Sequence, residues 1–246
     1  MNLKDQHVGN INDYRKYALL RALSAGGANQ LGICWMLTES DDGSHDNQFD
    51  YLEQRERYRH YDPDLFDTLA HIAEKPKRRN VNSIKTSCVL PDALFHSDPL
   101  PQTPDERAHY MSQCQTQFAA TDIVFFDPDN GIKIRSGSMS PKSTRRYIFL
   151  DEIAAFYAGG KSALICQHFP IRQHPRPFVA ARVAHLRSIA PGTDMWVFTT
   201  AQVAFLLVIH PDSPGNLALA ATEACSRWHH SFIRGERINT ASPFGD

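Results

Sequence analysis

The sequence predicts an α/β protein in which a mostly parallel sheet lies between two layers of helices and ends in an antiparallel hairpin. Short apolar runs bounded by turn residues alternate with longer segments of helical periodicity. Several of these runs are apolar throughout, which is typical of parallel strands covered on both faces. The last two runs are too close together for a parallel crossover, so they predict a hairpin.

The predicted strands follow the apolar runs in order. The clearest are residues 31–37, 122–126, 162–167, 195–199 and 204–210, and weaker candidates are 80–84 and 147–150. The hairpin joins the last two clear strands around Ala201 and Gln202.

The predicted helices fit between the strands, and Asp13 is the expected N-cap of the first one. They span residues 13–25, 63–74, 104–119, 151–158, 175–189 and 217–228. The chain contains no internal repeat. We therefore expect one domain over residues 1–246, with an N-terminal arm at 1–12 and a helical insertion at about 51–80.

The composition is that of an ordinary globular protein. The 246 residues are 42% hydrophobic and 22% charged, which excludes disordered and collagen-like chains. The five cysteines include no CxxC pair, so neither a zinc knuckle nor a disulfide framework is predicted. The longest apolar run, 203–209, is too short to span a bilayer. We expect a cytoplasmic protein with no membrane partner.

Charge is almost balanced overall but unevenly placed. Lys and Arg total 26 against 27 Asp and Glu, so net charge alone suggests no polyanion partner. Between Arg21 and Arg55, however, all six charged residues are acidic, whereas residues 132–193 contain ten basic residues and two acidic ones. A fold that gathers these basic residues could bind a phosphate backbone; if they interleave with acidic neighbours, the charges cancel. The first alternative predicts DNA or RNA as a partner.

The most unusual string is 123–131, Ile-Val-Phe-Phe-Asp-Pro-Asp-Asn-Gly. It places Asp127 at the carboxyl end of a strand, where open α/β sheets bind ligands. Pro128 ends the strand and Gly131 permits a tight turn, so Asp129 and Asn130 should be held in a fixed geometry. The string predicts a functional site, with an ordinary turn as the alternative.

A second string, 7–17, reads His-Val-Gly-Asn-Ile-Asn-Asp-Tyr-Arg-Lys-Tyr. Asp13 and Lys16 are three positions apart, so they share one face of the predicted helix. A lysine beside apolar surface can direct its ammonium group into a cleft. The alternative is a weak surface ion pair.

Both strings carry a resemblance to a known family. The pattern H-x-G-N-x-x-D-x-x-K resembles the signature HxGNxxDxxKH of the bacterial large-subunit ribosomal RNA adenine-N6 methyltransferase family. The matching residues are His7, Gly9, Asn10, Asp13 and Lys16. Asp127-Pro128 resembles the first half of the D-P-P-Y motif of that family. The order of the predicted elements is also similar.

The resemblance implies a Rossmann-like, methyltransferase-like fold, S-adenosylmethionine as cofactor and a nucleic acid as partner. It implies that Asp127 and the Pro128 carbonyl accept hydrogen bonds from an exocyclic amine. The candidate catalytic residues are Asp127, Asp129, Asn130, Lys16 and His168. The candidate cofactor-binding residues are His7, Gly9, Asn10, Asp13 and Glu39.

The chain departs from the family pattern at two places. Residues 38–46 after the first strand read Thr-Glu-Ser-Asp-Asp-Gly-Ser-His-Asp instead of a glycine-rich turn, and D-P-P-Y becomes Asp-Pro-Asp-Asn, which lacks the aromatic residue that would stack on a base.

These departures motivate a second interpretation, a metal-dependent hydrolase of phosphoester or glycosidic bonds. Its Mg²⁺ or Mn²⁺ site would use Asp41, Asp127 and Asp129, helped by the other acidic residues of 39–46 and by His168. If the acidic run 39–50 is instead an ordinary solvated loop, it forms no such site. A third possibility is a non-catalytic relative that binds nucleic acid.

Overall fold

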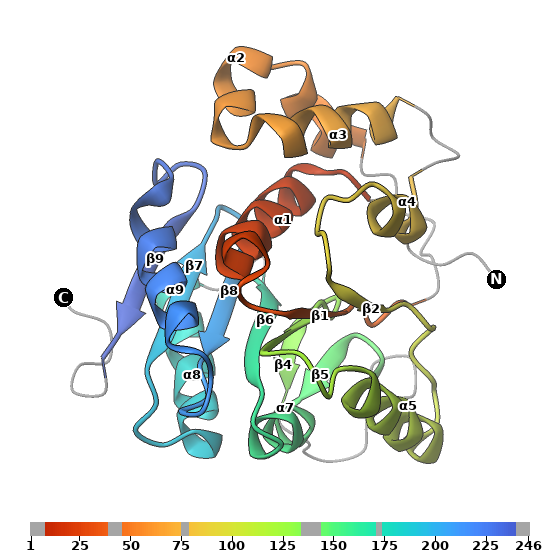
Figure 1. Cartoon of the computed structure of the whole chain (residues 1–246), viewed down its shortest axis with the longest axis vertical. Helices are drawn as coiled ribbons and strands as arrows, with labels where there is room; N and C mark the ends of the chain where they lie inside the picture. Colours follow the sequence, from red (N-terminus) through yellow and green to blue (C-terminus); the bar gives the residue numbers. More distant parts are fainter. Residues whose placement is uncertain (1–7, 39–45, 75–78, 134–143, 171–173, 240–246) are drawn as a thin grey trace.

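The computed structural model describes residues 8–38, 46–74, 79–133, 144–170 and 174–239, with the backbone alone at 46–48. Its centre is a seven-stranded sheet in the order β2-β1-β3-β6-β8-β7-β9 (Figure 1). These strands are β1 (Leu31–Cys34), β2 (Leu94–His96), β3 (Ile123–Phe126), β6 (Ser162–His168), β7 (Met195–Thr199), β8 (Val203–Val208) and β9 (Arg234–Ile238). A separate parallel pair is formed by β4 (Gly131–Lys133) and β5 (Tyr147–Phe149).

The strands β2, β1, β3 and β6 are parallel to one another. β8 is antiparallel to both β6 and β7, and β7 is antiparallel to β9. The predicted hairpin of β7 and β8 is therefore present, but it does not end the sheet, because β9 adds an edge strand beyond it. The chain has a Rossmann-like fold in which β8 and β9 run opposite to the other five strands of a mostly parallel sheet.

The longer helices are α1 (Ile11–Ser24), α3 (Pro63–Ala73), α5 (Pro104–Gln117), α7 (Leu150–Ala158), α8 (Pro175–Ile189) and α9 (Gly215–Arg227). The shorter ones are α2 (Arg55–Tyr58), α4 (Val81–Thr86) and the 3₁₀ turns η1 (Ala25–Gly27), η2 (Asp46–Leu52) and η3 (Arg59–Tyr61). The helical segment beside α1 at the top of Figure 1 consists of η2, α2, η3 and α3.

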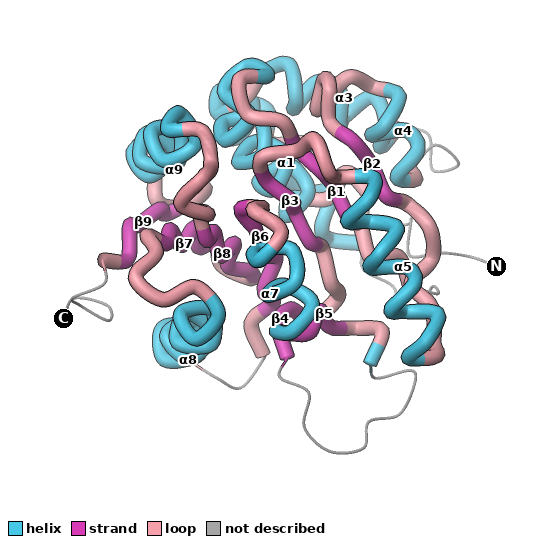
Figure 2. Tube along the Cα trace, turned by 60° about the horizontal axis from the view of Figure 1, so that its bottom comes forward, coloured by secondary structure: helices cyan, strands magenta, loops and turns pink. Residues whose placement is uncertain are grey.

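Alternate side chains of each central strand enter two separate cores. In β3, Ile123 and Phe125 belong to the core beneath α1, α3 and α9. Val124 and Phe126 belong to the core beneath α5, α7 and α8. Figure 2 shows the two groups of helices on opposite faces of the sheet. This arrangement confirms the predicted three-layer α/β fold, with β1, β3 and β6 buried on both faces.

Two local predictions are wrong. Residues 80–84 were expected to form a strand, but 81–84 lie in α4 and Asn80 is its N-cap, whose side chain accepts a hydrogen bond from the Ser83 amide. Asp13 was the expected N-cap of α1, but Asn10 occupies that position and its side chain accepts a hydrogen bond from the Asp13 amide at 2.9 Å. Asp13 is thereby placed in the first helical turn.

None of the helices in the described ranges has both the length and the apolar composition needed to cross a membrane.

Candidate functional site

The carboxyl ends of β1, β3 and β6 meet at one edge of the sheet. From β1 the sheet extends to β2 on one side and to β3 on the other, so a topological switch point lies between β1 and β3. A cavity of about 630 Å³ opens there, and we call it the switch-point cavity. Its walls come from the strand ends, the first turn of α1 and the β7–β8 turn.

Lys16 joins the two sequence motifs inside this cavity. Its ammonium nitrogen lies 2.6 Å from Asp13 Oδ1 and 2.6 Å from Asp127 Oδ2. The residue is only 8% exposed, so this is a buried cluster and the alternative of a weak surface pair is wrong. Burial alone lowers the pKa of Lys16, but the carboxylates of Asp127 and Asp13 outweigh it and raise the pKa well above its usual 10.5. The raised pKa favours the protonated form of Lys16, whose ammonium contacts both carboxylates.

The N-terminal segment is arranged around Asp13. The backbone amide of Gly9 donates to Asp13 Oδ2 at 2.9 Å, and the Gly9 carbonyl accepts from the Tyr51 hydroxyl at 2.8 Å. Gly9 has φ +91°, a conformation that favours glycine. Gly9 thus orients Asp13, whereas Asn10, Asp13 and Lys16 line the switch-point cavity.

The loop after β3 is held from both sides. The Asp127 amide donates to the Cys34 carbonyl at 3.1 Å, and the Thr38 hydroxyl donates to Asp129 Oδ2 at 3.0 Å. Both contacts tie this loop to the end of β1. Asp127, Pro128 and Asp129 line the switch-point cavity.

Gln167 fixes the far end of the same loop. This residue, 1% exposed at the end of β6, accepts from the Ile132 amide at 2.9 Å and donates to the Asn130 carbonyl at 2.6 Å. Gly131 has φ +112°, and a Cβ on it would lie 2.2 Å from Gln167 Nε2. Only glycine fits beneath this side chain. We call the two hydrogen bonds between Gln167 and this loop the Gln167 clamp. Asn130, within the clamped loop, lines a second cavity and not the switch-point cavity.

The turn after β1 lacks the glycines of the family pattern, yet its backbone takes a glycine-like conformation. Met36, buried at the cavity wall, has φ +49°. A left-handed conformation costs a residue with a side chain roughly 1–2 kcal/mol. Such strain clusters at ligand sites, and it occurs here at the carboxyl end of β1.

Two more polar residues at the rim and one thiol at the wall were not among the sequence candidates. Asn12 in α1 donates from its side chain to Gln202 Oε1 in the β7–β8 turn at 2.7 Å, which bridges opposite rims. Burial raises the pKa of the Cys166 thiol, and Asp127 raises it further, so Cys166 remains protonated. In the sequence, Asn12, Gln202 and Cys166 are marked only by their position near the end of a helix or strand. Such positions are too common to identify a site.

His168 lies at the end of β6 and lines both the switch-point cavity and the second cavity. The second cavity, of about 760 Å³, lies beside α8, and we call it the α8 cavity. Three consecutive residues, His168, Phe169 and Pro170, form the wall between the two cavities.

Several predicted site residues fall outside the described residues. They are His7, Glu39, Asp41 and Asp42, together with the Asp46 side chain. Among the side chains that the structure describes, no three His, Cys, Asp or Glu residues are grouped to hold a metal ion. Asp127 and Asp129 lie at the same cavity, but they are paired with Lys16 and Thr38 respectively.

The basic residues of 132–193 are spread over the molecule. Lys161 lies at the amino end of β6, opposite the cavities, where its ammonium donates to the carbonyls of Ala119 and Thr121. Arg187 donates to the Asn239 carbonyl. Arg182, in contrast, lines the α8 cavity.

No model of a known protein family matches this sequence, and no curated protein is significantly similar to it.

Proposed function

We propose that this protein is an S-adenosylmethionine-dependent methyltransferase that modifies an exocyclic amine of a base in nucleic acid. The observation that carries the proposal is the contact between Lys16 and Asp127. These residues belong to the two motifs that resemble the ribosomal RNA adenine-N6 methyltransferase family, and 111 positions separate them. If the resemblance of the two motifs were accidental, we would not expect both to line one cavity at the switch point, as they do.

The sheet is compatible with this proposal. A mostly parallel sheet with a hairpin near its end is one architecture of methyltransferase-like domains, and here β8 runs against its neighbours β6 and β7. The fold alone selects no activity, since similar sheets host many functions.

The switch-point cavity fits the cofactor in size and charge. Its volume falls within the range of small-molecule sites. Apolar side chains from Trp35, Leu37 and Phe205 offer a surface for an adenine ring, and the strained turn at Met36 brings the chain backbone to the same wall. Three aspartates against one lysine give the lining an excess of negative charge, which suits a sulfonium cation. When bound, the cofactor supplies an electrophilic methyl group.

The residues of this chain would position the amine. Asp127 and the Pro128 carbonyl accept its hydrogen bonds, as the family resemblance implies. Lys16 keeps the Asp127 carboxylate in place from one side, and the Gln167 clamp holds the loop from the other. Partly buried, pre-oriented acceptors of this kind favour one geometry of the incoming nitrogen.

Titration calorimetry with S-adenosylmethionine, followed by transfer of a labelled methyl group to RNA and to single-stranded DNA, tests the proposal. We expect binding by the wild-type protein and its loss in Asp127→Asn and Lys16→Met. Lys161→Met, at the opposite end of β6, is the control and should bind normally. Absence of cofactor binding by folded wild-type protein would refute the proposal.

A further inference from the structure

The α8 cavity differs in chemistry from its neighbour. It is lined by Asn130 and Gln167 on the sheet side, by Tyr147 of β5, and by Phe178 and Arg182 of α8. Its described lining contains no carboxylate, whereas the switch-point cavity has three. The two cavities therefore offer opposite electrostatic environments on the two sides of residues 168–170.

Arg182 faces no carboxylate among the described residues that line this cavity. Its guanidinium lies 4.6 Å from the centre of the Phe178 ring. Its Nε is buried and has no hydrogen-bond partner among the described residues. Arg182 also lines the cavity, where its guanidinium can donate to a ligand oxygen. The planar guanidinium is well suited to phosphate, which it can bind through two parallel hydrogen bonds.

Aromatic rings stand beside this cation. Phe178 and Tyr147 line the cavity, and Phe169 belongs to the wall that it shares with the switch-point cavity. Proteins that bind single-stranded nucleic acid combine aromatic faces for the bases with cations for the backbone. The bases of a duplex are already stacked on one another, so an aromatic pocket of this kind favours a single strand.

We propose that the α8 cavity binds the nucleotide adjacent to the target base in a single-stranded nucleic acid, with its base on Phe178 or Tyr147 and its phosphate at Arg182. The identity of the target base rests on the proposed function, but the α8 cavity can be tested without it. The thin wall at 168–170 would separate two consecutive bases.

The test measures binding of fluorescently labelled single-stranded RNA and DNA 12-mers by anisotropy at several salt concentrations. Arg182→Gln should weaken binding about fivefold to tenfold, by removing one charged phosphate contact. It should also lower the slope of log affinity against log salt concentration by about 0.7. Phe178→Leu should weaken binding about tenfold through lost stacking and leave the slope unchanged.

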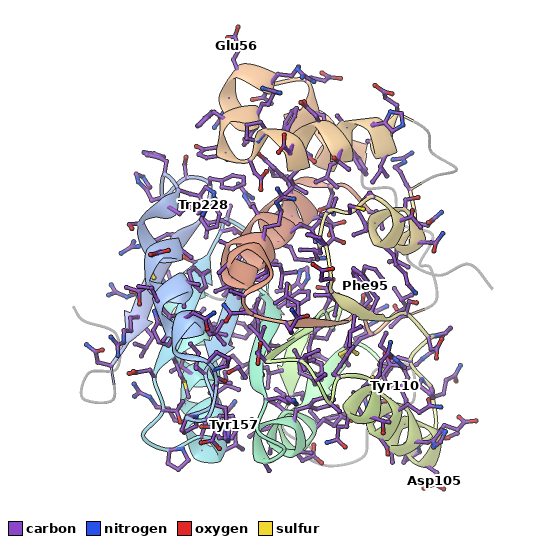
Figure 3. The ribbon with its side chains drawn as sticks, in the orientation of Figure 1. Glu56, Phe95, Asp105, Tyr110, Tyr157 and Trp228 are labelled. Carbon is purple, nitrogen blue, oxygen red and sulfur yellow. The ribbon has the colours of Figure 1, made fainter. Side chains whose placement is uncertain are left out.

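Arg57→Gln is the matched control, because it removes the same charge from an exposed position on α2. Its neighbour Glu56 points away from the rest of the molecule at the far end from α8 (Figure 3). Thermal unfolding of all three variants verifies that they fold. A duplex of the same sequence and a free mononucleotide are the competing ligands, and both should bind more weakly than the single strand.

Two results would overturn the inference: an affinity of Arg182→Gln equal to that of Arg57→Gln, or wild-type protein that does not prefer single strands. Calorimetry separates this inference from the proposed function. Binding of strands that depends on Arg182, without cofactor binding, would keep the inference and reject the methyltransferase. If the cofactor binds but Arg182→Gln still binds strands normally, the methyltransferase proposal stands and this inference is rejected.

Discussion

The Lys16 ammonium lies 2.6 Å from the Asp127 carboxylate and at the same distance from Asp13, inside a cavity at the carboxyl ends of the central strands. One side chain from the first helix thus holds a loop that follows β3. The pair links the stability of the fold to the geometry of the candidate site. Removing the Lys16 ammonium frees the Asp127 carboxylate and also leaves Asp13 without its ion-pair partner.

Lys16→Met should destabilise the protein by about 3 kcal/mol, the usual cost of removing one partner from a buried ion pair. Urea unfolding at pH 7 measures the change. The double variant Lys16→Met with Asp127→Asn should regain part of the loss, because one of the unpaired carboxylates is then gone. Equal stability of the single and double variants would show that Asp127 is solvated in the folded protein.

Alkaline pH should weaken the fold. Burial raises the pKa of Tyr17 above its usual 10.0, and Asp13 raises it further. Lys16 also has a raised pKa. A group with a raised pKa keeps its proton in the folded state while the unfolded chain releases it, so the free energy of unfolding falls as the pH rises above about 10.

Urea midpoints between pH 8 and 11 test this dependence. Below pH 9 the midpoint should be flat with respect to these groups. Tyr17→Phe, which cannot ionise, should show a shallower fall than wild type above pH 10. An identical fall in both proteins would mean that the Tyr17 hydroxyl ionises equally well when folded.

Gly131→Ala should disrupt the site far more than Gly160→Ala. Both glycines have positive φ, but a Cβ on Gly160 meets nothing within 4 Å, whereas one on Gly131 would overlap Gln167. Gly160→Ala should therefore cost about 1 kcal/mol, for backbone strain alone. Gly131→Ala should cost more and displace the loop of Asp127. Thermal unfolding and cofactor calorimetry would report the two effects, and similar values for both variants would contradict the clamp.

Mg²⁺ and Mn²⁺ should not shift the unfolding temperature in a manner that depends on Asp127. The ammonium of Lys16 already neutralises that carboxylate. Differential scanning fluorimetry of wild type and Asp127→Asn, each with either cation, checks the expectation. A stabilising shift that disappears in Asp127→Asn would instead favour the metal-dependent hydrolase.

The sequence predicted the parts of the fold that have strong local signals. Long apolar runs marked β3, β6, β7 and β8, and helical periodicity marked the longer helices. β2 (Leu-Phe-His) and β4 (Gly-Ile-Lys) were missed because each is three residues long and not apolar throughout, whereas β5 (Tyr-Ile-Phe), of the same length, is. β9 was missed because Arg-Gly-Glu-Arg-Ile alternates little and pairs only at an edge.

The candidate site was predictable only in part. Asp127 was expected at a strand end, and the resemblance placed both Asp127 and Lys16 among the candidate site residues, but their ion pair was not predicted. The clamp by Gln167 and the bridge from Asn12 to Gln202 depend on contacts between distant segments, 35 and 190 positions apart. No local pattern encodes such contacts. They follow from the register of β6 against its neighbours and from the placement of α1 over the sheet.

The charge of the switch-point cavity has a consequence for turnover. Asp13, Asp127 and Asp129 leave an unbalanced negative charge after Lys16 is counted. If the cavity binds the proposed cofactor, that charge attracts the molecule before the reaction, when its sulfur is cationic, and no longer attracts the sulfur afterwards, when it is a neutral thioether. The same carboxylates that hold the ligand would then help the spent one to leave, and inhibition by product would be weak.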